Sequence, residues 1–153
     1  MQISLEPVAD HPALFDTIAG WLWSEWGTAK NKELYRSLVA HSQRDGLPSI
    51  SVALAGTTPV GTVGLLRTDL LSRQEFTPWM AVLYVQPAWR STGIATLLQK
   101  HVVTRAQDMG YKEIFLYTKM TGYYEKNGWV YRESDYDDHG EVVRIYRKTL
   151  DKK

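Results

Sequence analysis

Apolar residues recur at helical spacing in the first part of the chain. A helix is expected from a start at Asp10-His11-Pro12 to Trp26, because a capping side chain and a proline precede apolar positions three or four residues apart. Gly27 ends this helix, and a second helix is expected from about residue 31 to residue 44. The segment Asp45-Gly46-Leu47-Pro48 breaks the second helix, since glycine and proline favour a turn.

Short apolar or alternating runs bounded by turn residues predict strands in the rest of the chain. The expected strands cover residues 3–8, 49–55, 60–67, 79–85, 113–117, 129–134 and 141–148. A third long helix is expected over residues 94–109, and a short helix near Tyr124. The order β-α-α-β-β-β-α-β-α-β-β predicts an α/β (mixed α+β) fold, with a mixed central sheet flanked by helices. The length predicts one domain over residues 1–153.

The segment from Val85 to Ala95 has the most specific pattern. A strand ends at Val85, Pro87 turns the chain, and a loop containing Gly93 opens the next helix. A helix start has unpaired backbone N–H groups and the positive end of the helix dipole, so this loop can bind phosphate. Arg90 adds a guanidinium at the loop entry. The N–H groups expected to contact phosphate are those of Ser91, Thr92, Gly93, Ile94 and Ala95.

Two other phosphate-binding motifs do not fit this sequence. The nearest match to a Walker A loop runs from Gly56 to Thr62, lacks the lysine, and lies between two strands as a hairpin turn would. No Gly-x-Gly-x-x-Gly follows a strand, so the dinucleotide motif is absent. The structural alternative is an ordinary strand-to-helix turn in which Gly93 serves only the backbone.

The pattern Arg90-x-x-Gly93-x-Ala95 resembles the acyl-CoA pyrophosphate loop of the GNAT N-acetyltransferase superfamily. The later segment from Gly122 to Trp129 is similar to the family's aromatic-Tyr-Glu-x-x-Gly-aromatic segment. The resemblance covers the middle and the C-terminal half of the chain and implies the GNAT fold, with acetyl-CoA as co-substrate. It also implies that backbone groups of Leu83 and Val85 pair with the pantetheine arm, as a peptide pairs with a sheet edge.

The resemblance places Tyr124 at the family's general-acid position, where its hydroxyl faces the departing CoA sulphur. The alternative is a core tyrosine whose hydroxyl bonds to the backbone. Many relatives have an asparagine that contacts pantetheine where this chain has Thr118, which is a candidate replacement. Many relatives also have a carboxylate on the strand that here covers residues 79–85, and this strand has none. The remaining candidates for a general base are Glu25, Asp69, Glu75 and His139, each of which can instead be a solvated loop charge.

In the family, the acceptor pocket lies between the first helical region and the last strand pair. The candidates in these segments are aromatic, acidic or basic: Trp23, Glu25, Trp26, Glu133, Asp135, Asp137, Asp138 and His139. Aromatic rings beside carboxylates suit a cationic amine, through cation–π and charge attraction. The same residues can instead fill the core or solvate a loop.

Charge and composition narrow the choice of partners. The formal net charge of +1 favours neither nucleic acid nor a membrane as a partner. The chain has no cysteine, which excludes a cysteinyl acyl-enzyme and favours direct transfer of the acetyl group. Its histidines lack metal-ligand spacing, so no metal site is expected. No apolar run approaches the roughly 20 residues of a membrane helix, and no signal-peptide pattern is present. A cytoplasmic monomer or homodimer is expected.

Two functions fit these observations. Tyr124 favours the first function, an N-acetyltransferase. Such an enzyme moves an acetyl group from acetyl-CoA directly to a primary amine of a small molecule or peptide. A non-catalytic acyl-CoA-binding sensor or interaction module is favoured by the missing strand carboxylate. A nucleotide-binding regulatory domain is disfavoured, because the Walker lysine and the dinucleotide glycines are absent.

Overall fold

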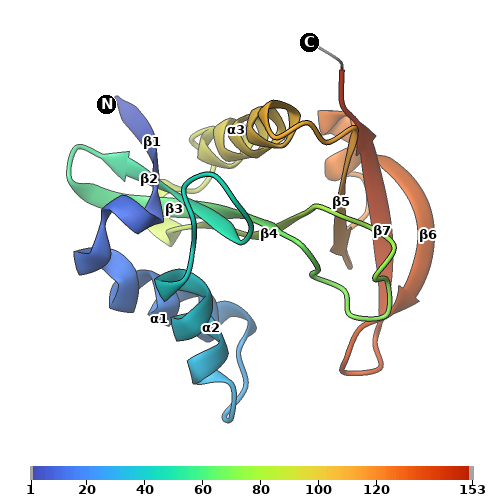
Figure 1. Ribbon diagram of the computed structural model, residues 1–153, viewed down its shortest axis with the longest axis horizontal. Coiled ribbons are helices and arrows are strands. Elements are labelled where there is room, and N and C mark those ends of the chain that lie inside the picture. Colours follow the sequence, from blue (N-terminus) through green and yellow to red (C-terminus); the bar gives the residue numbers. More distant parts are fainter. Residues whose placement is uncertain (1, 152–153) are drawn as a thin grey trace.

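Seven strands form one sheet in the computed structural model, which describes residues 2–151 (Figure 1). The strands are β1 (Ile3–Pro7), β2 (Ser49–Ala55), β3 (Thr58–Leu66), β4 (Trp79–Val85), β5 (Glu113–Thr118), β6 (Val130–Tyr136) and β7 (Val142–Thr149). Their order across the sheet is β1-β2-β3-β4-β5-β7-β6. All neighbours are antiparallel except β4 and β5. The sheet is therefore mixed, as the sequence predicts.

The parallel neighbours β4 and β5 are joined at one registered pair, Trp79 and Phe115. The amide of Phe115 also donates to the carbonyl of Pro78 at 3.0 Å. By contrast, β5 is registered with β7 along its whole length, from Glu113 to Thr118. We call the unpaired region beyond Trp79 and Phe115 the β4–β5 split. It divides the sheet into one half formed by β1–β4 and another formed by β5, β7 and β6.

Helices cover both faces of the sheet. The helices α1 (Phe15–Trp26) and α2 (Lys32–Ala40) pack on one face, and α3 (Ile94–Asp108) packs on the other (Figure 1). Ile18 and Leu22 of α1 are fully buried in a cluster with strand residues of the first face. Leu98 and Val102 of α3 belong to a separate cluster on the opposite face. The alternation of side chains along the strands supplies both clusters.

The long loop between β3 and β4 lies beside β7 (Figure 1). Its side chains close a third buried cluster with residues of β4, β5 and β7. Leu70 and Phe76 of this loop pack with four strand residues: Trp79, Phe115, Val143 and Ile145. The rings of Phe76 and Phe115 are stacked, with centroids 4.5 Å apart. Burial of these side chains fixes the loop against the sheet at the point where the split begins.

The predicted order of elements is confirmed, and three local predictions are corrected. The second helix ends at Ala40 rather than at residue 44, and beyond it Ser42 Oγ accepts the amide of Ile50 on β2 at 2.6 Å. Asp10 caps no helix. Two short 3₁₀ turns, η1 (Val8–Asp10) and η2 (Pro12–Leu14), precede α1, and the Asp10 carboxylate binds Arg44 at 2.6 Å.

The third correction concerns the short helix at Tyr124, which is the 3₁₀ turn η4 (Tyr124–Asn127). Gly128 follows it with a φ of 85°, and the chain then enters β6. Within residues 2–151, no helix is long and apolar enough to cross a lipid bilayer.

Candidate functional site

The edge of β4 that faces the split carries backbone groups that β5 does not bind. The amide of Gln86 donates to the carbonyl of Val60 on β3 at 2.9 Å, so Gln86 directs its backbone toward β3. Because successive residues of a strand direct their backbone groups to opposite edges, Val85 and Leu83 direct theirs toward the split. These are the two residues that the sequence analysis assigns to pantetheine pairing, and their orientation is compatible with that role.

A bulge in β4 lies beside this edge. Between the registered pairs Thr62–Tyr84 and Gly64–Ala81, β4 has one residue more than β3. Val82 takes a φ of 48°, which is unfavourable for a β-branched residue, and its carbonyl accepts a 2.8 Å hydrogen bond from the Thr62 hydroxyl. Strained backbone of this kind concentrates at functional sites. The sequence analysis missed the bulge, although the glycine at position 64 was a signal for it.

The loop after β4 has the geometry of an anion-binding site. It contains the 3₁₀ turn η3 (Pro87–Trp89) and then two left-handed residues, Ser91 with a φ of 62° and Gly93 with a φ of 89°. Such a backbone turns consecutive N–H groups toward one concavity. The first backbone bond of α3 is donated by Leu97 to Gly93, so the N–H groups of the preceding helical residues are free for a ligand. A Cβ built on Gly93 would meet no atom within 4 Å, so the concavity is open.

The structure therefore brings together the N–H groups that the sequence assigned to phosphate contact, those of Ser91, Thr92, Gly93, Ile94 and Ala95. The Thr92 hydroxyl is directed back to the Trp89 carbonyl and stabilises the turn.

Arg90, expected at the loop entry, lies against the end of β4. Its Nε donates to the carbonyl of Val85 at 2.9 Å, and its guanidinium lies 5.7 Å from the ring centroid of Tyr84. The side chain thus folds back on the end of β4, because an outward carbonyl and an aromatic face are both within its reach. Arg90 occupies one of the backbone groups that the pantetheine arm is expected to use.

Tyr124 lies on the same face of the sheet as α3. Its ring contacts those of Tyr123, Trp129 and Tyr146, with centroid distances of 4.8, 6.4 and 6.2 Å. Its hydroxyl has no hydrogen-bond partner among residues 2–151. This argues against a core tyrosine tied to the backbone. Burial, followed by the nearby Tyr123, raises the pKa of Tyr124 to about 12, so the hydroxyl keeps its proton at neutral pH.

Thr118 ends β5, on the side of the split opposite β4. Its Oγ1 accepts the Met120 amide at 3.1 Å, which forms a turn after the strand. The hydroxyl proton is free to be donated to a ligand. The structure thus leaves Thr118 able to take the contact expected of it.

The predicted acceptor residues are scattered. Asp135 accepts from Arg73 Nε at 2.6 Å and from the Ser72 hydroxyl at 2.9 Å, and Glu133 accepts from Arg73 Nη1 at 2.8 Å. Hydrogen bonds from the Tyr136 amide and from Arg73 hold the pKa of Asp135 below its usual value. Asp135 is therefore engaged in clamping the β3–β4 loop to β6, and it is not free to bind an amine.

Glu25, Trp26 and His139 have exposed side chains. Trp26 is 42% exposed, and its ring lies 6.4 Å from that of Tyr84 near the β4 edge. Glu25 follows on the last turn of α1 and has no partner within the described chain. His139 lies at the tip of the β6–β7 hairpin, where its backbone amide donates to the Asp137 carboxylate at 2.9 Å.

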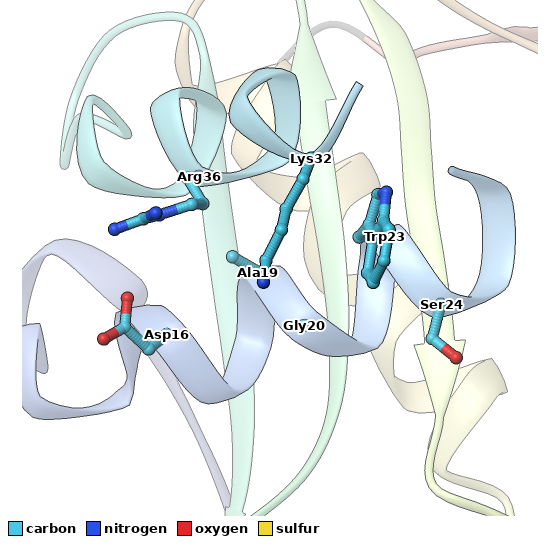
Figure 2. Close-up of a pocket in the computed structure, with 7 residues that line it drawn as sticks. All are labelled: Asp16, Ala19, Gly20, Trp23, Ser24, Lys32 and Arg36. Atoms are coloured by element: carbon cyan, nitrogen blue, oxygen red, sulfur yellow. The ribbon is translucent and has the colours of Figure 1, made fainter. Parts of the chain in front are cut away.

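Trp23 faces a different part of the molecule. A hollow of about 480 Å³ lies between α1 and α2, lined by Asp16, Ala19, Gly20, Trp23, Ser24, Lys32 and Arg36 (Figure 2). The Lys32 ammonium lies 5.3 Å from the Trp23 ring centroid, and Trp23 Nε1 donates to the Thr28 carbonyl at 2.8 Å. Trp23 thus lies away from Ile18 and Leu22, which face the sheet. Its assignment to the acceptor pocket at the split is corrected.

The candidate bases differ in their surroundings. Glu75 is exposed and lies 3.6 Å from Arg73, whereas Asp69 is half-buried in the β3–β4 loop. Burial, and after it the charge of Asp138, raises the pKa of Asp69 to about 7. Of the three carboxylates and one imidazole suggested by the sequence, Asp69 is the one whose side chain is not exposed.

Comparison with known proteins identifies the family and shows a shared fold. The model of the acetyltransferase (GNAT) family matches residues 15–129. An aminoglycoside 6'-N-acetyltransferase complexed with coenzyme A superposes with a TM-score of 0.74 at 16% identity, covering 100% of this chain and 99% of that chain. The NatC complex bound to Gag peptide and CoA contains a chain with a TM-score of 0.75 at 16% identity, covering 99% of this chain and 100% of that chain.

A GNAT-family acetyltransferase from Staphylococcus aureus Mu50 gives a TM-score of 0.72 at 16% identity, with 98% of this chain and 100% of that chain covered. The curated proteins give no match to the sequence. At these identities the solved structures show a shared fold, and the family match carries the assignment.

Proposed function

Since the chain belongs to the acetyltransferase (GNAT) family and takes its acetyl group from acetyl-CoA, we propose that it transfers this group directly to a primary amine. The acceptor is the amine of a small molecule or a peptide. Residues 1–153 act as a single acyl-CoA-binding N-acetyltransferase domain. The cytoplasmic location expected from the sequence stays a prediction.

The observation that carries the proposal is the free edge of β4. This edge starts at the Trp79–Phe115 pair, passes the Val82 bulge, and ends at the loop with left-handed Ser91 and Gly93. Its outward backbone groups suit the amides of a pantetheine arm, and the concavity at its end suits a pyrophosphate. An acyl-CoA placed along this edge directs its thioester into the split, between the two faces of the sheet.

Tyr124 assists the departure of the CoA sulphur through a hydrogen bond. The pKa of Tyr124 is raised to about 12, whereas an ordinary thiol has a pKa of about 8.5. Complete transfer of the tyrosine proton to a free thiolate is therefore uphill by about 5 kcal/mol. Because the transfer is unfavourable but the O–H is a good donor, Tyr124 stabilises the charge that develops on sulphur, and solvent supplies the final proton.

The primary-amine acceptor is supported by two observations. One similar structure is an aminoglycoside 6'-N-acetyltransferase, and another is the NatC complex bound to a peptide. Aminoglycosides and peptides both carry amines. The chain also lacks cysteine, so its acetyl group cannot rest on a thiol before transfer. Direct attack by a bound nucleophile is the simplest route that remains.

A panel of amines tests the proposal. The protein is incubated with acetyl-CoA and, separately, polyamines, aminoglycosides and short peptides with a free N-terminus, and the release of free thiol is measured. We expect amine-dependent thiol release with at least one class. CoA binding by calorimetry without turnover on any amine would favour the alternative, a non-catalytic acyl-CoA-binding sensor or interaction module.

A further inference from the structure

We infer that the carboxylate of Asp69 accepts the proton of the acceptor amine. This inference rests on the proposed function and names the residue that supplies its missing base. The strand position that is acidic in many relatives has no carboxylate in this chain. Either a residue elsewhere in the fold is the base, or bulk water takes the proton from an amine whose pKa is lowered by burial.

The position of Asp69 is fixed by its neighbour in the chain. Leu70 is 3% exposed and packs in the buried cluster that contains Trp79 and Phe115, the registered pair at which β4 and β5 meet. Tyr117, two residues further along β5, packs on the same cluster, and its ring lies edge-on to Trp79 at 6.1 Å. Asp69 is therefore held where the two strands begin to separate.

Asp69 and Tyr124 lie on opposite faces of the sheet. Leu116 belongs to the α3-side cluster on which Tyr124 packs, whereas Phe115 belongs to the cluster under the Asp69 loop. A thioester carbonyl in the split then has the base on one side and the donor to its sulphur on the other. This arrangement matches the reaction, because the nucleophile enters and the sulphur leaves on different sides of the carbonyl carbon.

The carboxylate of Asp69 is free to act. It makes no hydrogen bond or ion pair within the described part of the chain. The two arginines of its own loop are directed elsewhere: Arg67 donates to Thr68 and Gln74, and Arg73 is held by Glu133 and Asp135.

Three titratable groups interact electrostatically with Asp69, and each comes from a different element. They are Tyr35 of α2, Tyr117 of β5 and Asp138 of the β6–β7 hairpin. None of these groups is a cation. An ammonium group entering this space therefore meets a carboxylate without a cationic partner, close enough to Tyr35 and Tyr117 to act on both, and electrostatics favours its binding.

The surroundings also tune the basicity of Asp69. Burial raises its pKa to about 7, well above the ordinary value of 3.8. An amine has a pKa of about 10.4 in water, and burial beside the sheet lowers it. The two pKa values thus approach each other, and proton transfer becomes far easier than to a solvated carboxylate.

The proton count of the reaction balances. The bound ammonium gives one proton to Asp69, which passes it to solvent. The neutral nitrogen then bonds to the carbonyl carbon, the carbon–sulphur bond breaks, and the electron pair leaves on sulphur. The nitrogen loses its second proton as the amide forms, and the sulphur takes up one from solvent. One proton is released for each amide formed.

Asp69→Asn tests the inference in the full chain, with an amine that the wild type acetylates. We expect kcat/KM to fall by about 100- to 10,000-fold, the range usual for a lost general base. Affinity for CoA should be unchanged, because the CoA loop is elsewhere. In the wild type, kcat/KM should fall as the pH drops below about 7, the pKa of Asp69, and this acidic limb should be absent in the variant.

Two further variants distinguish catalysis from structure. Glu75→Gln removes an exposed carboxylate from the same loop and should leave both rate and pH profile as in the wild type. Asp138→Asn removes the like charge that helps to raise the pKa of Asp69, so the acidic limb should move to lower pH.

Each outcome has a distinct meaning. An active wild type whose Asp69→Asn variant keeps the rate and the acidic limb would overturn the role of Asp69 and leave the proposed function intact. A wild type that binds CoA but acetylates no amine would overturn both.

Discussion

Gly64 on β3 lies against the bulge of β4, and a Cβ built on it would be 2.7 Å from Cγ2 of Val82. Val82 already has a φ of 48° and a stiff, branched side chain, so it has little freedom to move away. The absence of a side chain at position 64 is therefore a condition for the bulge that borders the split.

Gly64→Ala should destabilise the protein by about 1–3 kcal/mol, the usual range for overpacking a tight site. It should also weaken acetyl-CoA binding, because relief of the clash displaces the β4 edge. Chemical denaturation and calorimetry measure the two effects. Gly20→Ala is the matched control: no atom lies within 4 Å of a Cβ there, in the middle of α1, and stability should rise. Equal behaviour of the two variants would show that the bulge tolerates a side chain opposite it.

Gly93→Glu should abolish measurable CoA binding. The new side chain places a negative charge in the concavity formed by the backbone at Ser91 and Gly93, where the pyrophosphate is expected. Gly110→Glu is the control for backbone strain and added charge. Gly110 also has a positive φ, of 90°, and open space around it, but it lies at the opposite end of α3. Calorimetric titration should show wild-type affinity for this control. Equal loss in both variants would point to backbone strain alone.

Tyr124→Phe should lower turnover about 10- to 1000-fold while leaving CoA binding and thermal stability near the wild-type values. The ring keeps its contacts, and only the hydrogen bond to the departing sulphur is lost. Tyr111→Phe removes a hydroxyl from another half-buried ring of the α3-side cluster and should leave turnover unchanged. Wild-type turnover in Tyr124→Phe would return Tyr124 to a structural role.

Asp69 should make the folded state less stable as the pH rises. The pKa of Asp69 is about 7 in the folded chain, against an ordinary value of 3.8 that we take for the unfolded chain, so between these pH values the folded chain binds more protons than the unfolded one. The free energy of unfolding then decreases with rising pH across this window, by no more than about 4 kcal/mol, and is constant above it.

Asp69→Asn removes this penalty. Its melting temperature should exceed that of the wild type at pH 8, by roughly 2–4 °C for each kcal/mol recovered, and the difference should disappear near pH 4. Melting curves at several pH values measure the effect. A constant difference across the whole range would mean that Asp69 has an ordinary pKa in the folded protein.

Local features of this fold could be predicted from the sequence, because neighbouring residues determine them. The strand, the turn at Pro87 and the glycine before α3 lie within one short segment, so their geometry follows from adjacent residues. The direction of Arg90 was not predictable in this way. It depends on the Val85 carbonyl and the Tyr84 ring, two groups whose placement requires the finished strand.

Features that depend on distant residues escaped the sequence analysis. The clamp between Arg73 and Asp135 joins residues 62 positions apart, and no periodicity indicates which carboxylate an arginine will meet. For the same reason Asp135 was assigned to the acceptor pocket, and Asp69 could not be separated from the other base candidates. Burial decides among carboxylates, and burial is a property of the folded chain.

The single registered pair between β4 and β5 has a mechanical consequence. Two halves of a sheet joined at Trp79 and Phe115 can hinge there, because few backbone bonds resist a change in the angle between them. A ligand lying in the split contacts both halves and locks that angle. Binding of acetyl-CoA should therefore slow amide hydrogen exchange in β5 and β7 as well as in β4. Occupancy of the donor site would then make the half of the sheet formed by β5, β7 and β6 more rigid.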